Sequence, residues 1–148
     1  MSDAPVWVLD TNVLVSGLLS PFGPPGRLVD ALLARNLTIA VDDRIEAEYR
    51  DVLARPKLLI PAVRRAAVQA IFGFQAHVTA LPWSGSPLPD PDDTMFLEVA
   101  LQTSAPTLVT GNPSHFPATC RGPVLVWSPR DAWERFIAIG VPGSRTGH

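Results

Sequence analysis

The sequence lacks most of the features that mark secreted and membrane proteins. Cys120 is its only cysteine in 148 residues, so the chain can form neither an internal disulfide nor a thiolate metal site of its own. It has no basic N-terminal region followed by a long apolar core, and its apolar runs are too short to span a membrane. We therefore expect a cytoplasmic protein with no membrane partner.

Neither sign of charge is in large excess. The chain has 12 Lys and Arg against 14 Asp and Glu, and a formal net charge of -2. It therefore lacks the broad basic surface of a stable nucleic-acid binder. A nucleic-acid enzyme remains compatible with this balance, because acidic clusters that bind metal lower the net charge of the protein that carries them.

The length and composition are those of one globular domain. Hydrophobic residues make up 47% of the chain and charged residues 18%, which is typical of a folded protein with a buried core. We expect a single domain over residues 1–139, followed by a flexible C-terminal tail over 140–148.

Short apolar runs alternate along the chain with stretches of helical periodicity. We expect strands at 6–9, 37–41, 77–81, 107–110 and 124–127, and helices at 13–19, 26–34, 44–53, 62–76, 94–102 and 129–139. This alternation predicts an α/β fold in which helices cover both faces of a parallel sheet. Ligands of such sheets bind beyond the C-terminal ends of the strands.

A lone carboxylate, Asp10, follows the first apolar run in VWVLDTNVLVSGLLS at 6–20. Burial of an unpaired charge is costly, and no Lys or Arg lies between Met1 and Arg27. Three further oxygen groups are candidates to meet Asp10 at one sheet edge: Glu48 inside the helix expected at 44–53, Asp93 at the start of a later helix, and Asn112 just after the fourth strand. Hard divalent ions take such oxygen ligands, so the pattern indicates a site for Mg²⁺ or Mn²⁺.

Each of these residues also has a purely structural interpretation. Asp10 and Asp93 stand where they can cap helices, and Glu48 can belong to an exposed helix face. Asn112 can be a left-handed turn residue after Gly111.

The chain resembles the PIN-domain family, and within it the small toxin-like single-domain members. The resemblance rests on VLDTNVLVSGLL at 8–19, EAEYRDVLARPKL at 46–58, DPDDTMFLEVAL at 90–101, LVTGN at 108–112 and VLVWSPRDAW at 124–133. It implies a three-layer α/β/α sandwich around a five-stranded parallel sheet, and an Mg²⁺- or Mn²⁺-dependent endoribonuclease.

The resemblance also implies roles for individual residues. Asp10, Glu48 and Asp93 match the family's catalytic, metal-binding acidic positions. The fourth acidic position departs from the family pattern, because it is Asn112, which keeps an oxygen ligand but not the charge. The supporting polar residues are Thr11, Asn12, Ser16 and Thr110.

Three partners follow from the same resemblance: an RNA substrate, a cognate antitoxin protein and a second copy of the chain in a homodimer. Arg50, Arg55 and Lys57 belong to the densest basic stretch and are candidate RNA contacts, although a solvated helix face explains them equally well. The alternative function is a catalytically weak or inactive module that binds RNA or protein, which Asn112 favours. A metal phosphatase is disfavoured because Asp10-Thr11-Asn12 lacks an Asp-x-Asp.

Overall fold

Five short parallel strands form the centre of the computed structural model, which describes residues 4–140. The strands are β1 (Val6–Leu9), β2 (Thr38–Val41), β3 (Ala76–His77), β4 (Thr107–Val109) and β5 (Leu125–Trp127), and their order in the sheet is β3-β2-β1-β4-β5. All four strand pairings are parallel. The predicted parallel sheet is therefore confirmed.

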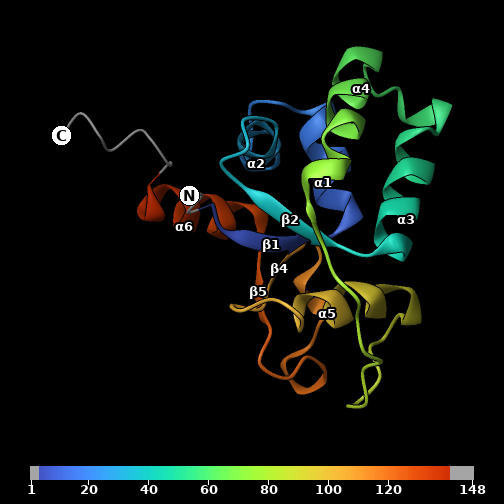
Figure 1. Ribbon diagram of the computed structural model, residues 1–148, viewed down its shortest axis with the longest axis vertical. Helices are drawn as coiled ribbons and strands as arrows, with labels where there is room; N and C mark the ends of the chain where they lie inside the picture. Colours follow the sequence, from blue (N-terminus) through green and yellow to red (C-terminus); the bar gives the residue numbers. More distant parts are fainter. Residues whose placement is uncertain (1–3, 141–148) are drawn as a thin grey trace.

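Helices cover the sheet on both sides and give the predicted α/β/α sandwich. They are α1 (Thr11–Leu19), α2 (Pro24–Leu33), α3 (Asp43–Leu53), α4 (Ala62–Ala70), α5 (Thr94–Ala100) and α6 (Pro129–Ile139). Figure 1 shows α1, α2, α3 and α4 above the strands and α5 below them. The C-terminal helix α6 packs against α2 and β5.

The strand order changes direction between β1 and β4. From β1 the chain adds β2 and β3 on one side, and later adds β4 and β5 on the other. β1 and β4 are direct neighbours, with Val8 beside Leu108 and Leu9 beside Val109. The C-terminal ends of adjacent strands at such a switch point form the usual binding crevice of open α/β sheets.

The core lies where the central strands meet the helices. Leu9 and Val109 are fully buried at the ends of β1 and β4. The residues that follow them, Asp10 and Thr110, are therefore attached directly to the packed core. Between β1 and β5, Trp7 packs edge-on against Trp127, with ring centroids 5.3 Å apart. The tryptophans of the strands therefore serve packing.

The structure corrects the predicted elements between α3 and α5. The helix expected at 62–76 ends at Ala70, and a 3-10 turn, Phe72–Phe74, leads directly into β3. β3 itself covers only two residues rather than 77–81. The side chain of Gln75 explains the early change, since its Oε1 accepts a hydrogen bond from the Ile39 amide and its Nε2 donates to the Ile71 carbonyl, both over 2.9 Å.

Residues 141–148, most of the tail expected from 140 onward, lie outside the described residues, as do residues 1–3. Between residues 4 and 140, none of the helices has the length and apolar character needed to cross a membrane.

Candidate active site

Asp10 lies at the switch point of the sheet, between the end of β1 and the start of α1. Its backbone amide donates to the Val109 carbonyl of β4 over 2.9 Å. Asp10 is 6% exposed, and its carboxylate accepts hydrogen bonds from Thr110 Oγ1 over 2.8 Å and from Asn12 Nδ2 over 3.3 Å. Although Asp10 occupies the N-cap position of α1, its side chain makes no capping hydrogen bond. The capping interpretation therefore does not describe this carboxylate.

Glu48 reaches the same edge of the sheet from the middle of α3. Its Oε2 accepts a short hydrogen bond from the hydroxyl of Thr11, the first residue of α1. The neighbouring residue on α3, Tyr49, is fully buried and donates from its hydroxyl to the Leu9 carbonyl over 2.6 Å. This bond fixes α3 against the end of β1, and so it sets where the Glu48 carboxylate lies.

Asp93 closes the 3-10 turn Pro91–Asp93 that precedes α5. Asp90, not Asp93, caps this turn, because its side chain accepts from the Asp92 amide over 2.9 Å. Oδ2 of Asp93 lies 3.3 Å from His115 Nδ1. Their geometry is not that of a hydrogen bond, and this buried oxygen has no hydrogen-bond partner among the described residues.

The three carboxylates interact electrostatically through Asp10. Burial raises the pKa of Asp10, and the negative charge of Glu48 adds to this effect, while the hydroxyl of Thr110 and nearby backbone amides oppose it. Burial, followed by the charges of Asp10 and Asp90, raises the pKa of Asp93 to about 6, although His115 acts in the opposite direction. Like charges that raise the pKa of one another favour a cation beside them.

The donor set of this acidic cluster, defined as Asp10, Glu48 and Asp93, suits a hard divalent ion. It offers carboxylate oxygens, including Oδ2 of Asp93, whose contact with His115 is not a hydrogen bond, and such ions prefer oxygen ligands. Within residues 4–140, no group of three or more Asp, Glu, His or Cys side chains is placed so that it could hold a metal ion by itself. An ion held here would complete its shell with water, as Mg²⁺ commonly does.

The predicted supporting residues link the ends of β1 and β4. Asn12 Oδ1 accepts from the Gly111 amide over 3.2 Å, and Thr110 Oγ1 accepts from the Asn112 amide over 3.0 Å. The Thr110 hydroxyl therefore bridges the Asn112 amide and the Asp10 carboxylate. Ser16 is exposed and lines a shallow hollow with Asn12 and Asn112.

Asn112 is not a left-handed turn residue, because its φ is -126°. Its side chain is exposed beside that hollow. The interpretation of Asn112 as a turn residue of that kind was therefore wrong, and its role as an oxygen ligand stays a prediction.

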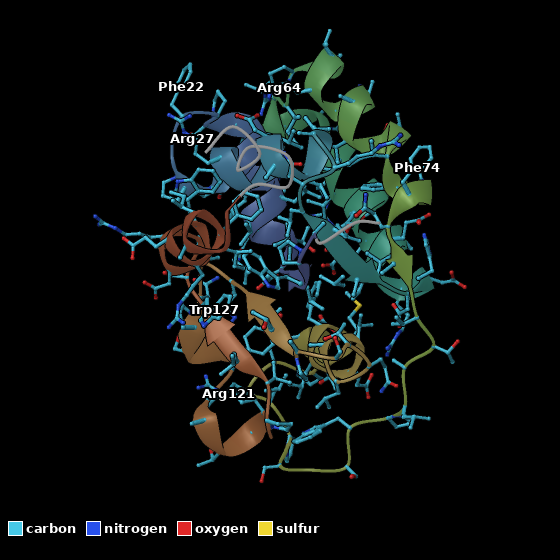
Figure 2. All side chains as sticks on the ribbon, turned by 60° about the vertical axis from the view of Figure 1, so that its left-hand side comes forward. Phe22, Arg27, Arg64, Phe74, Arg121 and Trp127 are labelled. Atoms are coloured by element: carbon cyan, nitrogen blue, oxygen red, sulfur yellow. The ribbon has the colours of Figure 1, made fainter. Side chains whose placement is uncertain are left out.

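The predicted RNA contacts lie along α3 and beyond its end. Arg50 pairs with Glu46 over 3.2 Å, Arg55 pairs with Asp51 over 2.9 Å, and Lys57 is exposed. None of the contacts described for these three residues joins them to the acidic cluster. The other arginines are spread out, with Arg27 and Arg64 at one end of the molecule and Arg121 at the other (Figure 2).

Arg44 and Glu98 line a hollow together with Glu48 and were not among the predicted site residues. Glu98, on α5, is 7% exposed and accepts from Arg44 Nη1 over 2.8 Å and from the Trp83 amide over 2.6 Å. The signal was present in MFLEVAL, where a single charge stands in an apolar stretch, as Asp10 does in its own.

The raised pKa of Asp93 predicts how the stability of the metal-free protein depends on pH. Between its ordinary value of 3.8 and about 6, the folded state holds a proton on Asp93 that the unfolded state has lost. The stabilising contribution of Asp93 is therefore complete below about pH 4 and is lost as pH rises through about 6. In chelator, the Tm of the parent minus that of Asp93→Asn should fall by a few degrees between pH 5 and 7.5. A constant difference would contradict this prediction.

Comparison with known proteins agrees with this geometry. The family model described as PIN domain matches residues 6–114, a range that contains the whole acidic cluster and most of the sheet. No curated protein and no solved structure matches the chain. Proteins with this domain are generally nucleases and generally use divalent metal ions. Since the match covers well over half of the chain and the parallel sheet agrees with it, the chain belongs to the PIN-domain family.

Proposed function

We propose that this PIN-domain protein is an Mg²⁺- or Mn²⁺-dependent endoribonuclease. The observation that carries the proposal is the acidic cluster at the switch point of the sheet, with a buried Asp93 oxygen that has no hydrogen-bond partner among the described residues. Carboxylates arranged in this way are the usual means by which proteins hold a divalent ion for phosphodiester hydrolysis.

Asp10, Glu48 and Asp93 would hold the ion, and their neighbours would fix their orientations. Thr110 and Asn12 orient the Asp10 carboxylate, and Thr11 orients that of Glu48. When bound, a divalent ion lowers the pKa of a water ligand and stabilises negative charge on a phosphoryl oxygen. Asn112 would help to position water or a second ion. The proposed products carry a 5'-phosphate and a 3'-hydroxyl.

We further propose that the protein acts in the cytoplasm as the toxin of a toxin–antitoxin pair. The support is its resemblance to small single-domain members of the family, set out above. Its antitoxin would cover the acidic cluster and neutralise it with a basic side chain, because the like charges there attract a cation. A homodimer is part of the same proposal.

Cleavage in the presence and absence of metal tests the enzymatic proposal. Purified protein should cut single-stranded RNA with Mg²⁺ or Mn²⁺ and stop when chelator is added. RNA binding that is independent of metal and occurs without cleavage would instead identify a binding module. Co-purification with the product of a neighbouring reading frame that inhibits cleavage is the expected result for a toxin.

Metal binding should also be visible without RNA. An ion that binds only the folded state stabilises it, so Mg²⁺ or Mn²⁺ at about ten times its Kd should raise the Tm by a few degrees. Asp10→Asn should remove most of this shift. The control is Asp30→Asn, since Asp30 is exposed and lies 3.9 Å from Arg64, outside the cluster. Equal shifts in parent and Asp10→Asn would show that the ion binds elsewhere.

A further inference from the structure

Arg44 separates two hollows beside the acidic cluster. It lies on α3 one turn before Glu48 and lines the same hollow as Glu48, Thr94 and Met95. It also lines a hollow of about 640 Å³ whose other wall includes Val78, Ala80 and Pro82 from the segment after β3. A volume of this size is within the range of small-ligand sites, so a nucleotide next to the cleaved bond has room there.

The guanidinium of Arg44 is held in place by two carboxylates. Nε and Nη2 donate to Asp42 Oδ2 over 2.9 and 2.7 Å, and Nη1 donates to the buried Glu98 Oε1 over 2.8 Å. Asp42 is itself fixed, because its other oxygen caps α3 by accepting from the Ile45 amide. Arg44 is therefore preorganised, although its side chain is 49% exposed.

Two N–H donors of Arg44 remain for a ligand. A guanidinium carries five N–H groups, and the three bonds above use three of them. The described part of the chain provides no acceptor for the others. They are available at the border of the two hollows.

The surrounding charge favours a neutral acceptor over a phosphate. Asp42 and Glu98 together outweigh the single positive charge of Arg44, and Asp43 also lines the larger hollow. A phosphate there would face more negative than positive charge. A nucleobase brings neutral acceptor atoms, and its flat faces suit the apolar wall formed by Val78, Ala80 and Pro82.

We propose that Arg44 is a specificity-determining residue that donates hydrogen bonds to the base of a nucleotide adjacent to the scissile phosphate. The inference rests on the proposed ribonuclease function. Guanine presents O6 and N7 as neighbouring acceptors and is the base that arginine reads best, so guanine is the expected preference.

Sequencing the ends of cut RNA tests this assignment. Parent protein with Mn²⁺ should cut a pool of random single-stranded RNAs with guanine enriched at one position beside the cut. Arg44→Met should reduce this enrichment about tenfold, the scale of one lost base contact. Arg44→Lys keeps a cation for Asp42 and Glu98 but not the planar fork, so it should fold as the parent does and still lose the preference.

Arg130→Met provides the control, because Arg130 is an exposed arginine that pairs with Glu134 over 3.7 Å on α6. It should leave the base profile unchanged. A parent that cuts RNA without base preference, or Arg44 variants that keep the parent's profile, would overturn the inference and leave the ribonuclease proposal intact. If the Arg44 variants keep the parent's base profile but the slope of log K against log salt concentration for RNA binding becomes shallower by about 0.7, Arg44 contacts a phosphate instead. If the parent cuts no RNA, the ribonuclease proposal fails and this inference fails with it.

Discussion

Asp10→Asn is expected to lower the rate of RNA cleavage by about a thousandfold or more, the scale on which loss of preorganised charge stabilisation acts. The charge of Asp10 raises the pKa of Asp93, and the charge of Glu48 raises the pKa of Asp10. Loss of Asp10 therefore removes the centre of the acidic cluster. An amide keeps the size of the side chain and can still accept from Thr110. Initial rates on one fluorescent RNA, with saturating Mn²⁺, measure the effect.

The same substitution should make the metal-free protein more stable. Removing the buried charge of Asp10 relieves the desolvation and repulsion that raise its pKa. We expect the Tm of Asp10→Asn in chelator to exceed that of the parent by a few degrees. Lower activity together with higher stability separates a functional charge from a structural one. A variant that cuts RNA as fast as the parent would refute the site, and Asp30→Asn serves as the matched control.

Gly26→Ala is expected to cause the largest loss of stability, about 3 kcal/mol or more. A Cβ at Gly26 would lie 2.2 Å from the Pro21 carbonyl oxygen and 2.3 Å from its carbon. Both atoms are backbone, so no side chain can rotate away to make room. The turn between α1 and α2 would have to move, and α1 carries Thr11 and Asn12 of the site.

Gly73→Ala is the matched control for this prediction. A Cβ at Gly73 would meet no heavy atom within 4 Å. The free energy of unfolding of this variant should therefore lie within about 1 kcal/mol of the parent's. Urea unfolding of both variants, followed by circular dichroism, makes the comparison. A Gly26→Ala protein as stable as Gly73→Ala would show that the helix turn is far softer than its packing indicates.

The sheet and the place of Asp10 at its edge could be predicted because both follow from local patterns in the sequence. Each central strand is a short apolar run, and Asp10 follows one of these runs directly. In a parallel sheet, such positions come together at one edge whatever the loops do. The family resemblance then selected Glu48 from the several acidic residues of α3, which periodicity alone did not distinguish.

The errors arose where a side chain from one segment satisfies the backbone of another. The helix expected at 62–76 is shorter because Gln75 bonds to the Ile39 amide of β2, a contact that helical propensity does not include. Arg44 and Glu98 are separated by 54 positions, so their ion pair has no local signature. Long-range polar contacts of this kind decide the details around the site.

The bond from Tyr49 to the Leu9 carbonyl is an uncharged contact that fixes the position of Glu48 in the acidic cluster. Glu48 and Tyr49 are consecutive, so a shift of α3 along its axis that misplaced the carboxylate would also leave a buried hydroxyl and a buried carbonyl unpaired. Folding therefore penalises misalignment of the helix before any ion or RNA is present. An uncharged hydrogen bond in the core therefore sets where the charged side chain of Glu48 lies.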